Sequence, residues 1–195
     1  MTAEPMAAAP APDYPVRFDV EYPDELSRLL IFFKWLLAFP AMVILLIVSL
    51  VVYLPFAAFF TILVRGKYPK WWFDVVVQFA ALQERFYAYA LLLRDEYPAL
   101  EDAPSVRLDV DYPATFSRWA PLYKWLLAIP HFLVAYVLTL LAYVFTIIAW
   151  FAILFTGRYP KGLFDFVVGS RRYALRVSAY ALYLLTDEYP PFSMK

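Results

Sequence analysis

Residues 16–23, VRFDVEYP, return 90 positions later as residues 106–113, VRLDVDYP. The stretches KWLLAFP, GKYPK and DEYP of the first half likewise return in the second half as KWLLAIP, GRYPK and DEYP. The offset grows only to 92 at the end of the repeat, where Asp95 matches Asp187. Self-similarity at a fixed period is the signature of a repeated structural unit. The sequence therefore predicts a tandem duplication of one unit of about 90 residues.

The composition is typical of a membrane protein. Hydrophobic residues make up 64% of the 195 residues and charged residues only 17%, with a mean hydropathy of +0.61. A water-soluble domain of this length does not bury so much apolar surface. The net charge of zero and the lack of a basic block argue against a nucleic-acid partner, because phosphate binding requires clustered cations. The absence of cysteine excludes disulfides, thiolate nucleophiles and cysteine metal sites.

The beginning of each repeat alternates between apolar and charged residues. In the first copy Val16, Phe18 and Val20 alternate with Arg17 and Asp19. A period of two predicts a short amphipathic strand, which the following Pro ends. Because a single strand has unpaired edges, we expect the two copies of the strand to pair with each other, with Arg and Asp as cross-strand partners.

The next segment of each repeat, residues 27–39 and 117–129, mixes Ser, Arg, Lys and Trp with apolar residues. It is too short to cross a bilayer and predicts an interfacial helix. In such a helix the Trp ring lies at headgroup depth and the Lys side chain extends to the aqueous interface. The expected interfacial anchors are Lys34, Trp35, Lys124 and Trp125.

The longest apolar stretches, residues 41–64 and 131–156, contain no Asp, Glu, Lys or Arg. At ~1.5 Å per residue the first helix would be ~36 Å long, enough to cross a hydrocarbon core of ~30 Å. Pro55 is expected to kink this helix, whereas Phe145 at the matching position leaves the second helix straighter.

The last segment of each repeat, residues 72–93 and 163–185, has the length of a helix but contains charges. It either returns through the membrane or lies on its surface. Nearly identical motifs indicate identical surroundings, which favours an even number of crossings per unit and two hairpins in parallel orientation. A re-entrant hairpin within the apolar stretch, with the charged helix on the surface, has the same parity and remains an alternative.

We therefore predict an all-α membrane protein built from two tandem repeats, with about four membrane helices in total. Each repeat consists of a short amphipathic strand, an interfacial helix and a membrane helical hairpin. The repeats are placed at residues 14–98 and 104–192, joined by a linker at 99–103. The Ala/Pro-rich residues 1–13 are expected to form a disordered tail.

The charged helices keep an Asp, an Arg and a Tyr on one helical face in both copies. These residues are Asp74, Arg85, Tyr89, Asp165, Arg176 and Tyr180, and the second copy adds Arg171 and Arg172. An arginine deep in a spanning helix needs a partner or a wet cavity, which makes the set a candidate lipid, partner or solute site. In the structural interpretation the aspartates favour a helix N-terminus and the arginines bind carbonyls, acids or lipid phosphates. We favour the structural interpretation.

Other polar features have plain interpretations. The Asp-Glu-Tyr-Pro segments at 95–98 and 187–190 are candidates for a hard-cation site, but a loop with calcium-binding spacing is missing and Pro simply ends a helix. His131, the only histidine, has Ala41 at the matching position, so we expect a structural role for it. We find no nucleophile–base pair, phosphate loop or metal-ligand cluster, and predict no enzymatic activity, metal or cofactor.

The stretches KWLLAIPH, WFAILFTGRYPKGLFDFVVG and RVSAYALYLLTDEYPPF of the second half resemble the prokaryotic membrane-protein family called domain of unknown function 4389. The first half is similar to it as a more divergent copy, with Ala80 and Ala81 in place of Arg171 and Arg172. The resemblance covers residues 16–192. It implies the cytoplasmic membrane of a bacterium or archaeon, and no particular activity.

Two functions are consistent with these features. The favoured one is a non-catalytic module, either an accessory or scaffold subunit of a larger membrane complex or a lipid-organising protein. Its expected partners are membrane lipids, other membrane-protein subunits or a second copy of the chain. The alternative is a small-solute transporter or channel on the interface between the repeats, lined by Arg85, Arg176 and tyrosines. The apolar helices offer few polar residues for a transport path, which favours the module.

Overall fold

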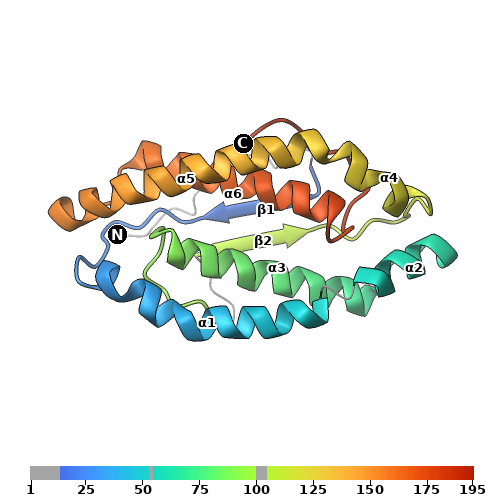
Figure 1. The fold of residues 1–195 in the computed structure, drawn as a ribbon, viewed down its shortest axis with the longest axis horizontal. Helices are drawn as coiled ribbons and strands as arrows, with labels where there is room; N and C mark the ends of the chain where they lie inside the picture. Colours follow the sequence, from blue (N-terminus) through green and yellow to red (C-terminus); the bar gives the residue numbers. More distant parts are fainter. Residues whose placement is uncertain (1–13, 53–54, 100–104) are drawn as a thin grey trace, which may run out of the picture.

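The computed structural model describes residues 14–52, 55–99 and 105–195. The elements in chain order are β1 (Val16–Val20), α1 (Leu30–Val52), α2 (Pro55–Arg65), α3 (Lys70–Ala90), β2 (Val106–Val110), α4 (Ala120–Leu127), α5 (Ile129–Thr156) and α6 (Lys161–Ala181). In Figure 1 the two strands lie at the centre between α3 and α6, and α1 and α5 lie outside them. Each half of the chain supplies one strand and two long helices packed against each other. The predicted tail at 1–13 and residues 100–103 of the predicted linker lie outside the described residues.

The predicted pairing of the two strands is confirmed. β1 and β2 are antiparallel, and the register places Arg17 opposite Asp109 and Asp19 opposite Arg107. The guanidinium of Arg17 binds the diagonal carboxylate of Asp111 instead, with N–O distances of 2.7 and 2.8 Å. The apolar residues of β1 are buried against the helices, so the charged side chains lie on the other face of the sheet. The sheet is therefore apolar on one face and polar on the other.

The two charged helices tie the halves of the chain together. α3, from the first half, contacts β2, and α6, from the second half, contacts β1. Both helices begin directly after a proline, Pro69 and Pro160. The proline fixes the backbone in an extended conformation before the first turn, and this defines where each helix starts. Each strand thus lies on the charged helix of the opposite half.

The boundaries predicted for the first apolar helix are wrong. We expected an interfacial helix over 27–39 and a second helix from Ala41 to Val64, but α1 continues through Pro40 and ends at Val52. One missing backbone N–H weakens a helix without ending it when the flanking turns pack well, and α1 packs along α3. α2 begins at Pro55, the residue expected to kink the predicted helix. Residues 53–54 between them are not described.

The second half follows the prediction more closely. α4 ends at Leu127 and α5 begins at Ile129, so Pro130 occupies the first turn of α5, where its missing N–H costs nothing. α5 is 28 residues long and continues without interruption past Phe145. Within the described part of the chain, two helical segments are long and apolar enough to cross a membrane, Leu30–Ser49 and Ile129–Thr156. The charges in α3 and α6 account for their absence from this set.

Candidate functional site

The lysines predicted as interfacial anchors are buried ion-pair partners. In the second half, Lys124 Nζ lies 2.5 Å from Asp187 and donates a hydrogen bond of 2.7 Å to the Thr186 carbonyl. The ring of Tyr180 lies 5.1 Å from the same ammonium group. Asp187 also accepts a hydrogen bond from the backbone N–H of Ser117, at 2.6 Å. Burial lowers the pKa of Lys124, and the hydrogen bond that Lys124 donates to Asp187 acts in the opposite direction.

The first half repeats this arrangement. Lys34 Nζ lies 2.8 Å from Asp95 and 2.7 Å from the Arg94 carbonyl, with the Tyr89 ring at 5.0 Å. Asp95 accepts the N–H of Ser27 at 2.7 Å. The expectation that Lys34 and Lys124 extend to the aqueous interface is therefore wrong, because each lysine meets a carboxylate from the segment that follows α3 or α6.

The tryptophans next to these lysines behave differently. Trp35 is 64% exposed and Trp125 is 56% exposed, and their role as interfacial anchors stays a prediction. The Trp125 indole donates to the Leu122 carbonyl, which is in its own helix. The Asp-Glu-Tyr-Pro segments, considered above for a hard cation, supply the aspartates that bind the buried lysines. Among the described residues, no group of three His, Asp or Glu side chains is arranged to hold a metal ion.

A buried ion pair joins α3 to α6. Arg171 Nε and Nη2 lie 3.1 and 2.6 Å from the two carboxylate oxygens of Glu84. The side chains of Arg171 and Glu84 are only 11% and 3% exposed, and the guanidinium lies 3.6 Å from the centre of the Tyr87 ring. Glu84 was not among the predicted site residues. The sequence does contain a sign of this pair, because the two copies differ at both positions. Glu84 matches Leu175, and Arg171 matches Ala80, so each charge is unique to its copy.

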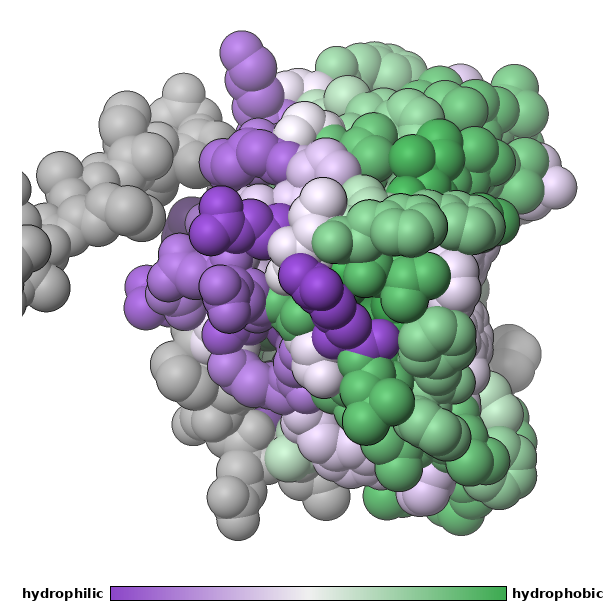
Figure 2. Space-filling view, turned by 90° about the vertical axis from the view of Figure 1, so that its left-hand side faces the viewer, coloured by the Kyte–Doolittle hydropathy of each residue, from purple (hydrophilic) through white to green (hydrophobic). Residues whose placement is uncertain are grey.

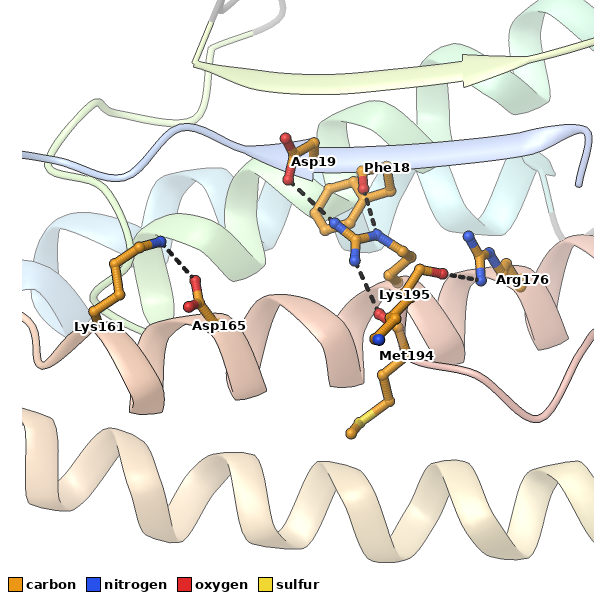
Figure 3. A network of polar contacts seen from close by, with 8 residues as sticks. Phe18, Asp19, Lys161, Asp165, Arg176, Met194 and Lys195 are labelled. Carbon is orange, nitrogen blue, oxygen red and sulfur yellow. Dashed lines mark hydrogen bonds and ion pairs between the residues drawn. The ribbon is translucent and has the colours of Figure 1, made fainter. Parts of the chain in front are cut away.

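Two further arginines of α6 hold the polypeptide segments beside that helix (Figure 3). Arg172 donates to oxygen atoms of β1 and of the C-terminal segment: Phe18 O at 2.7 Å, Met194 O at 2.8 Å and Asp19 Oδ1 at 3.1 Å. Arg176 is buried and donates to Lys195 O at 2.7 Å. Both arginines thus bind backbone carbonyls, Arg172 in β1 and both in the C-terminal segment, which agrees with the structural interpretation.

The predicted face of Asp, Arg and Tyr does not form one site. Asp74 and Asp165 are exposed and pair with the lysine four residues earlier in the same helix. Arg85 is buried and donates to the Ala99 carbonyl at 3.3 Å, while Tyr89 and Tyr180 contact the buried lysines. The shared residues therefore belong to three different sets of contacts.

The Gly-Lys/Arg-Tyr-Pro-Lys loops lock the two halves together, a role that the sequence pattern did not predict. Gly66 and Gly157 have positive φ angles of 64° and 74°. A Cβ atom on Gly66 would lie 3.0 Å from Arg118 Nε, and one on Gly157 would lie 3.3 Å from Arg28 Nε. Each loop thus lies against the Ser-Arg segment of the other half, which explains why both motifs occur twice.

The tyrosines of the repeated Tyr-Pro pairs reinforce this lock. The Tyr22 hydroxyl donates to the Tyr159 carbonyl, and the Tyr112 hydroxyl donates to the Tyr68 carbonyl, both at 2.5 Å. The sequence pattern predicts only that the proline of such a pair ends a helix or strand. Since both hydrogen bonds run between halves, these pairs also fix the halves relative to each other.

His131 is buried between α5, α6 and the C-terminal segment. Its Nδ1 atom lies 2.6 Å from the Tyr173 hydroxyl, and its ring stacks on Phe192 with a centroid distance of 4.0 Å. These contacts are those of a packed histidine, in line with the structural role expected from the sequence.

Comparison with known proteins gives one match. A family model described as Domain of unknown function (DUF4389) matches residues 118–194. This segment contains α4, α5 and α6, together with Lys124, Asp187 and the arginines of α6. Searches of curated proteins and of solved structures found no match. The buried pair of Lys124 and Asp187 and the Gly-Arg-Tyr-Pro-Lys loop thus lie within residues 118–194, the segment that this family model matches.

Proposed function

We propose that the protein is a non-catalytic membrane module that binds lipids through α1 and α5, either to organise them or as an accessory subunit of a larger membrane complex. One observation supports this most directly: both helices bury a single narrow face and expose apolar side chains everywhere else. α1 packs on α3 through Ile31, Lys34, Ala38 and Ala41, and large apolar residues on its other sides are exposed, among them Phe32, Phe33, Leu36, Phe39, Leu46 and Ile47.

α5 has the same character along its 28 residues. Its buried positions are His131, Ala142, Thr146, Ala149 and Ile153. Contiguous apolar patches on soluble monomers rarely exceed a few hundred Å², because each large apolar side chain left in water forgoes roughly 1.5–3 kcal/mol. In Figure 2 hydrophobic residues make up most of one side of the molecule. Acyl chains, or apolar helices of another subunit, are the surroundings that such a surface requires.

This module is favoured over the alternative of a small-solute transporter. A transport path needs polar groups that face a cavity and are available to a solute. The arginines expected to line such a path are engaged by the protein itself, Arg85 by the Ala99 carbonyl and Arg176 by the Lys195 carbonyl. We therefore assign these charges to structural contacts, and take the recurrence of the buried lysine–aspartate pair and of the Tyr-Pro hydrogen bond in both halves as support for a duplicated unit.

The proposal predicts membrane retention that depends on the apolar surface. The full chain should stay in the membrane fraction after an alkaline carbonate wash, dissolve only in detergent and carry phospholipid after mild purification. Replacing exposed Leu140 and Ile147 of α5 by Gln should weaken flotation with liposomes, whereas Asp109→Asn on the polar sheet face should not. Recovery of the wild-type chain as a monodisperse soluble monomer without detergent would contradict the proposal. Proteins recovered in the same purification distinguish an accessory subunit from a lipid-organising protein.

A further inference from the structure

The boundary between the polar and apolar sides of the molecule runs parallel to the long helices. In Figure 1 the helices α1, α3, α5 and α6 run along the long axis of the molecule. Figure 2 looks along that axis after a quarter turn, and it shows hydrophilic residues on one side and hydrophobic residues on the other. A helix that crosses a bilayer has an apolar band between two polar ends, so the boundaries cut across it. Here the boundary follows the helices instead.

The exposed face of α5 is apolar from end to end. Leu133, Val144 and Phe155 are 67%, 50% and 75% exposed. They are spaced by eleven residues, about three turns, so they lie on one face of the helix. The distance from the first to the last is about 33 Å at ~1.5 Å per residue, comparable to the thickness of the hydrocarbon core. All three would lie at the same depth if α5 were parallel to the membrane plane.

The charges beside the middle of α6 exclude a crossing orientation. α6 packs along α5, and Arg171 and Arg172 lie at its centre. Arg172 binds β1, where the Asp19 side chain is 74% exposed. If α5 crossed the bilayer, α6 would cross with it, and the polar face of the sheet would lie at the depth of the acyl chains. Exposed charges and open sheet edges are not tolerated there.

The two ends of the molecule carry unpaired cations. The loop containing Gly66 and the loop containing Gly157 follow α2 and α5 and lie at opposite ends of the long axis (Figure 1). Arg118 lies against Gly66 and Arg28 against Gly157. Among the residues that the structure describes, five exposed cations at these ends have no ion-pair partner: Arg28, Arg65, Lys67, Arg118 and Arg158. Trp119, next to Arg118, is 68% exposed, as suits an interfacial aromatic.

We propose that the protein inserts into a single leaflet, with α1 and α5 parallel to the membrane plane, the polar face of the sheet in water and the cations at both ends bound to anionic lipid headgroups. This inference rests on the proposed membrane function and specifies how the membrane is bound. It places both Gly-Lys/Arg-Tyr-Pro-Lys loops at the same headgroup layer, since the two ends of a molecule whose long axis lies in the membrane plane reach the same surface. The repeated motifs then have identical surroundings in both copies, although no helix crosses the membrane.

The natural absence of cysteine allows the depth of α5 to be measured directly. Single variants Leu133→Cys, Val144→Cys and Phe155→Cys, each carrying a nitroxide label in the full chain bound to phosphatidylglycerol/phosphatidylcholine vesicles, should report one common depth within the acyl region. Asp109→Cys on the sheet should report an aqueous environment. Flotation of each labelled chain with the vesicles is measured first, so that a chain that fails to bind contradicts the membrane function itself.

A different depth profile would overturn the inference while leaving the membrane function intact. A spanning α5 gives a deep label at Val144 and shallow labels at Leu133 and Phe155, and it moves the Asp109 label out of water. Equal aqueous exposure of the three α5 labels in a chain that floats with vesicles would equally contradict insertion through this face. The expected outcome is equal burial of the three α5 labels.

The cations provide a second test, because the two ends are not equivalent. Asp24 and Glu25 precede Arg28, whereas Ala114 and Thr115 occupy the matching positions before Arg118. Replacing Arg65, Lys67 and Arg118 by Gln should weaken binding to anionic vesicles by about fivefold per cation removed, and leave binding to neutral vesicles unchanged. The matched double variant Arg28→Gln with Arg158→Gln should weaken this binding less per cation removed, because Asp24 and Glu25 offset positive charge at that end. Unchanged affinity of the triple variant for anionic vesicles would refute the headgroup contacts.

Discussion

Glu84→Leu should destabilise the folded protein by about 3 kcal/mol, because it leaves the buried guanidinium of Arg171 without its counter-ion. The carboxylate of Glu84 binds Arg171 through both oxygens, and both side chains are almost completely buried. Little solvent reaches the site to replace the lost carboxylate, and stacking on Tyr87 satisfies only one face of the guanidinium. The measurement is thermal or denaturant unfolding of the purified chain in a mild detergent.

Two control variants separate the lost pairing from other effects. The double variant Glu84→Leu with Arg171→Met should recover most of the stability, since apolar residues of similar volume often replace a buried ion pair at little cost. Asp74→Asn breaks an exposed pair with Lys70 and should change the stability by about 0.5 kcal/mol or less. A single variant as stable as the wild type would show that this ion pair does not hold α3 to α6.

The strand pairing was predictable because its signal is local. Five alternating residues in each copy specify the strand, and an unpaired edge requires a partner, which the second copy supplies. The register with Arg17 opposite Asp109 follows from placing apolar residues on one face of both strands. The continuation of α1 through Pro40 was not predictable in the same way. It depends on packing along α3, and a residue-by-residue pattern does not contain that packing.

The misassignment of Lys34 has a similar cause. A lysine beside a tryptophan within an apolar segment is typical of an interfacial helix. Burial of the Lys34 ammonium is favourable only because Asp95, from a segment distant in sequence, pairs with it. The sequence did hold a usable signal, since Lys34 and Asp95 both recur, as Lys124 and Asp187. Contacts between the halves, such as that of Tyr22 with Tyr159, depend on how the halves face each other, and a repeat period does not contain this information.

Hydropathy predicts a membrane environment for the chain but not the direction in which its helices lie. Residues 131–156 satisfy the length and composition of a spanning helix, and the same residues equally suit a helix lying in a leaflet. The deciding feature is the polar sheet, which Arg172 holds against the centre of α6. A prediction that treats each apolar stretch separately can only count stretches long enough to cross a membrane. Whether such a helix can cross also depends on the charged helices packed beside it, which that prediction does not include.

Asp187→Ala should destabilise the fold by about 2–3 kcal/mol near pH 7, because it removes two contacts at once. Lys124 loses its counter-ion at a position where its side chain is only 2% exposed, and the backbone N–H of Ser117 loses its acceptor. The remaining hydrogen bond from Lys124 to the Thr186 carbonyl does not neutralise the charge. Asp165→Ala, which removes a carboxylate from the exposed pair with Lys161, is the matched control and should cost far less.

The pH dependence of the same variant identifies the buried lysine as the cause. Burial lowers the pKa of Lys124 below its ordinary value of 10.5, and removing Asp187 takes away the contact that raises it. The unfolded chain then binds more protons at this site than the folded chain, so the stability of the variant rises with pH between the lowered pKa and 10.5. The deficit relative to the wild type should therefore shrink from pH 7 to pH 10. A deficit that stays constant over this range would mean that the Ser117 hydrogen bond, and not the uncompensated ammonium, accounts for the loss.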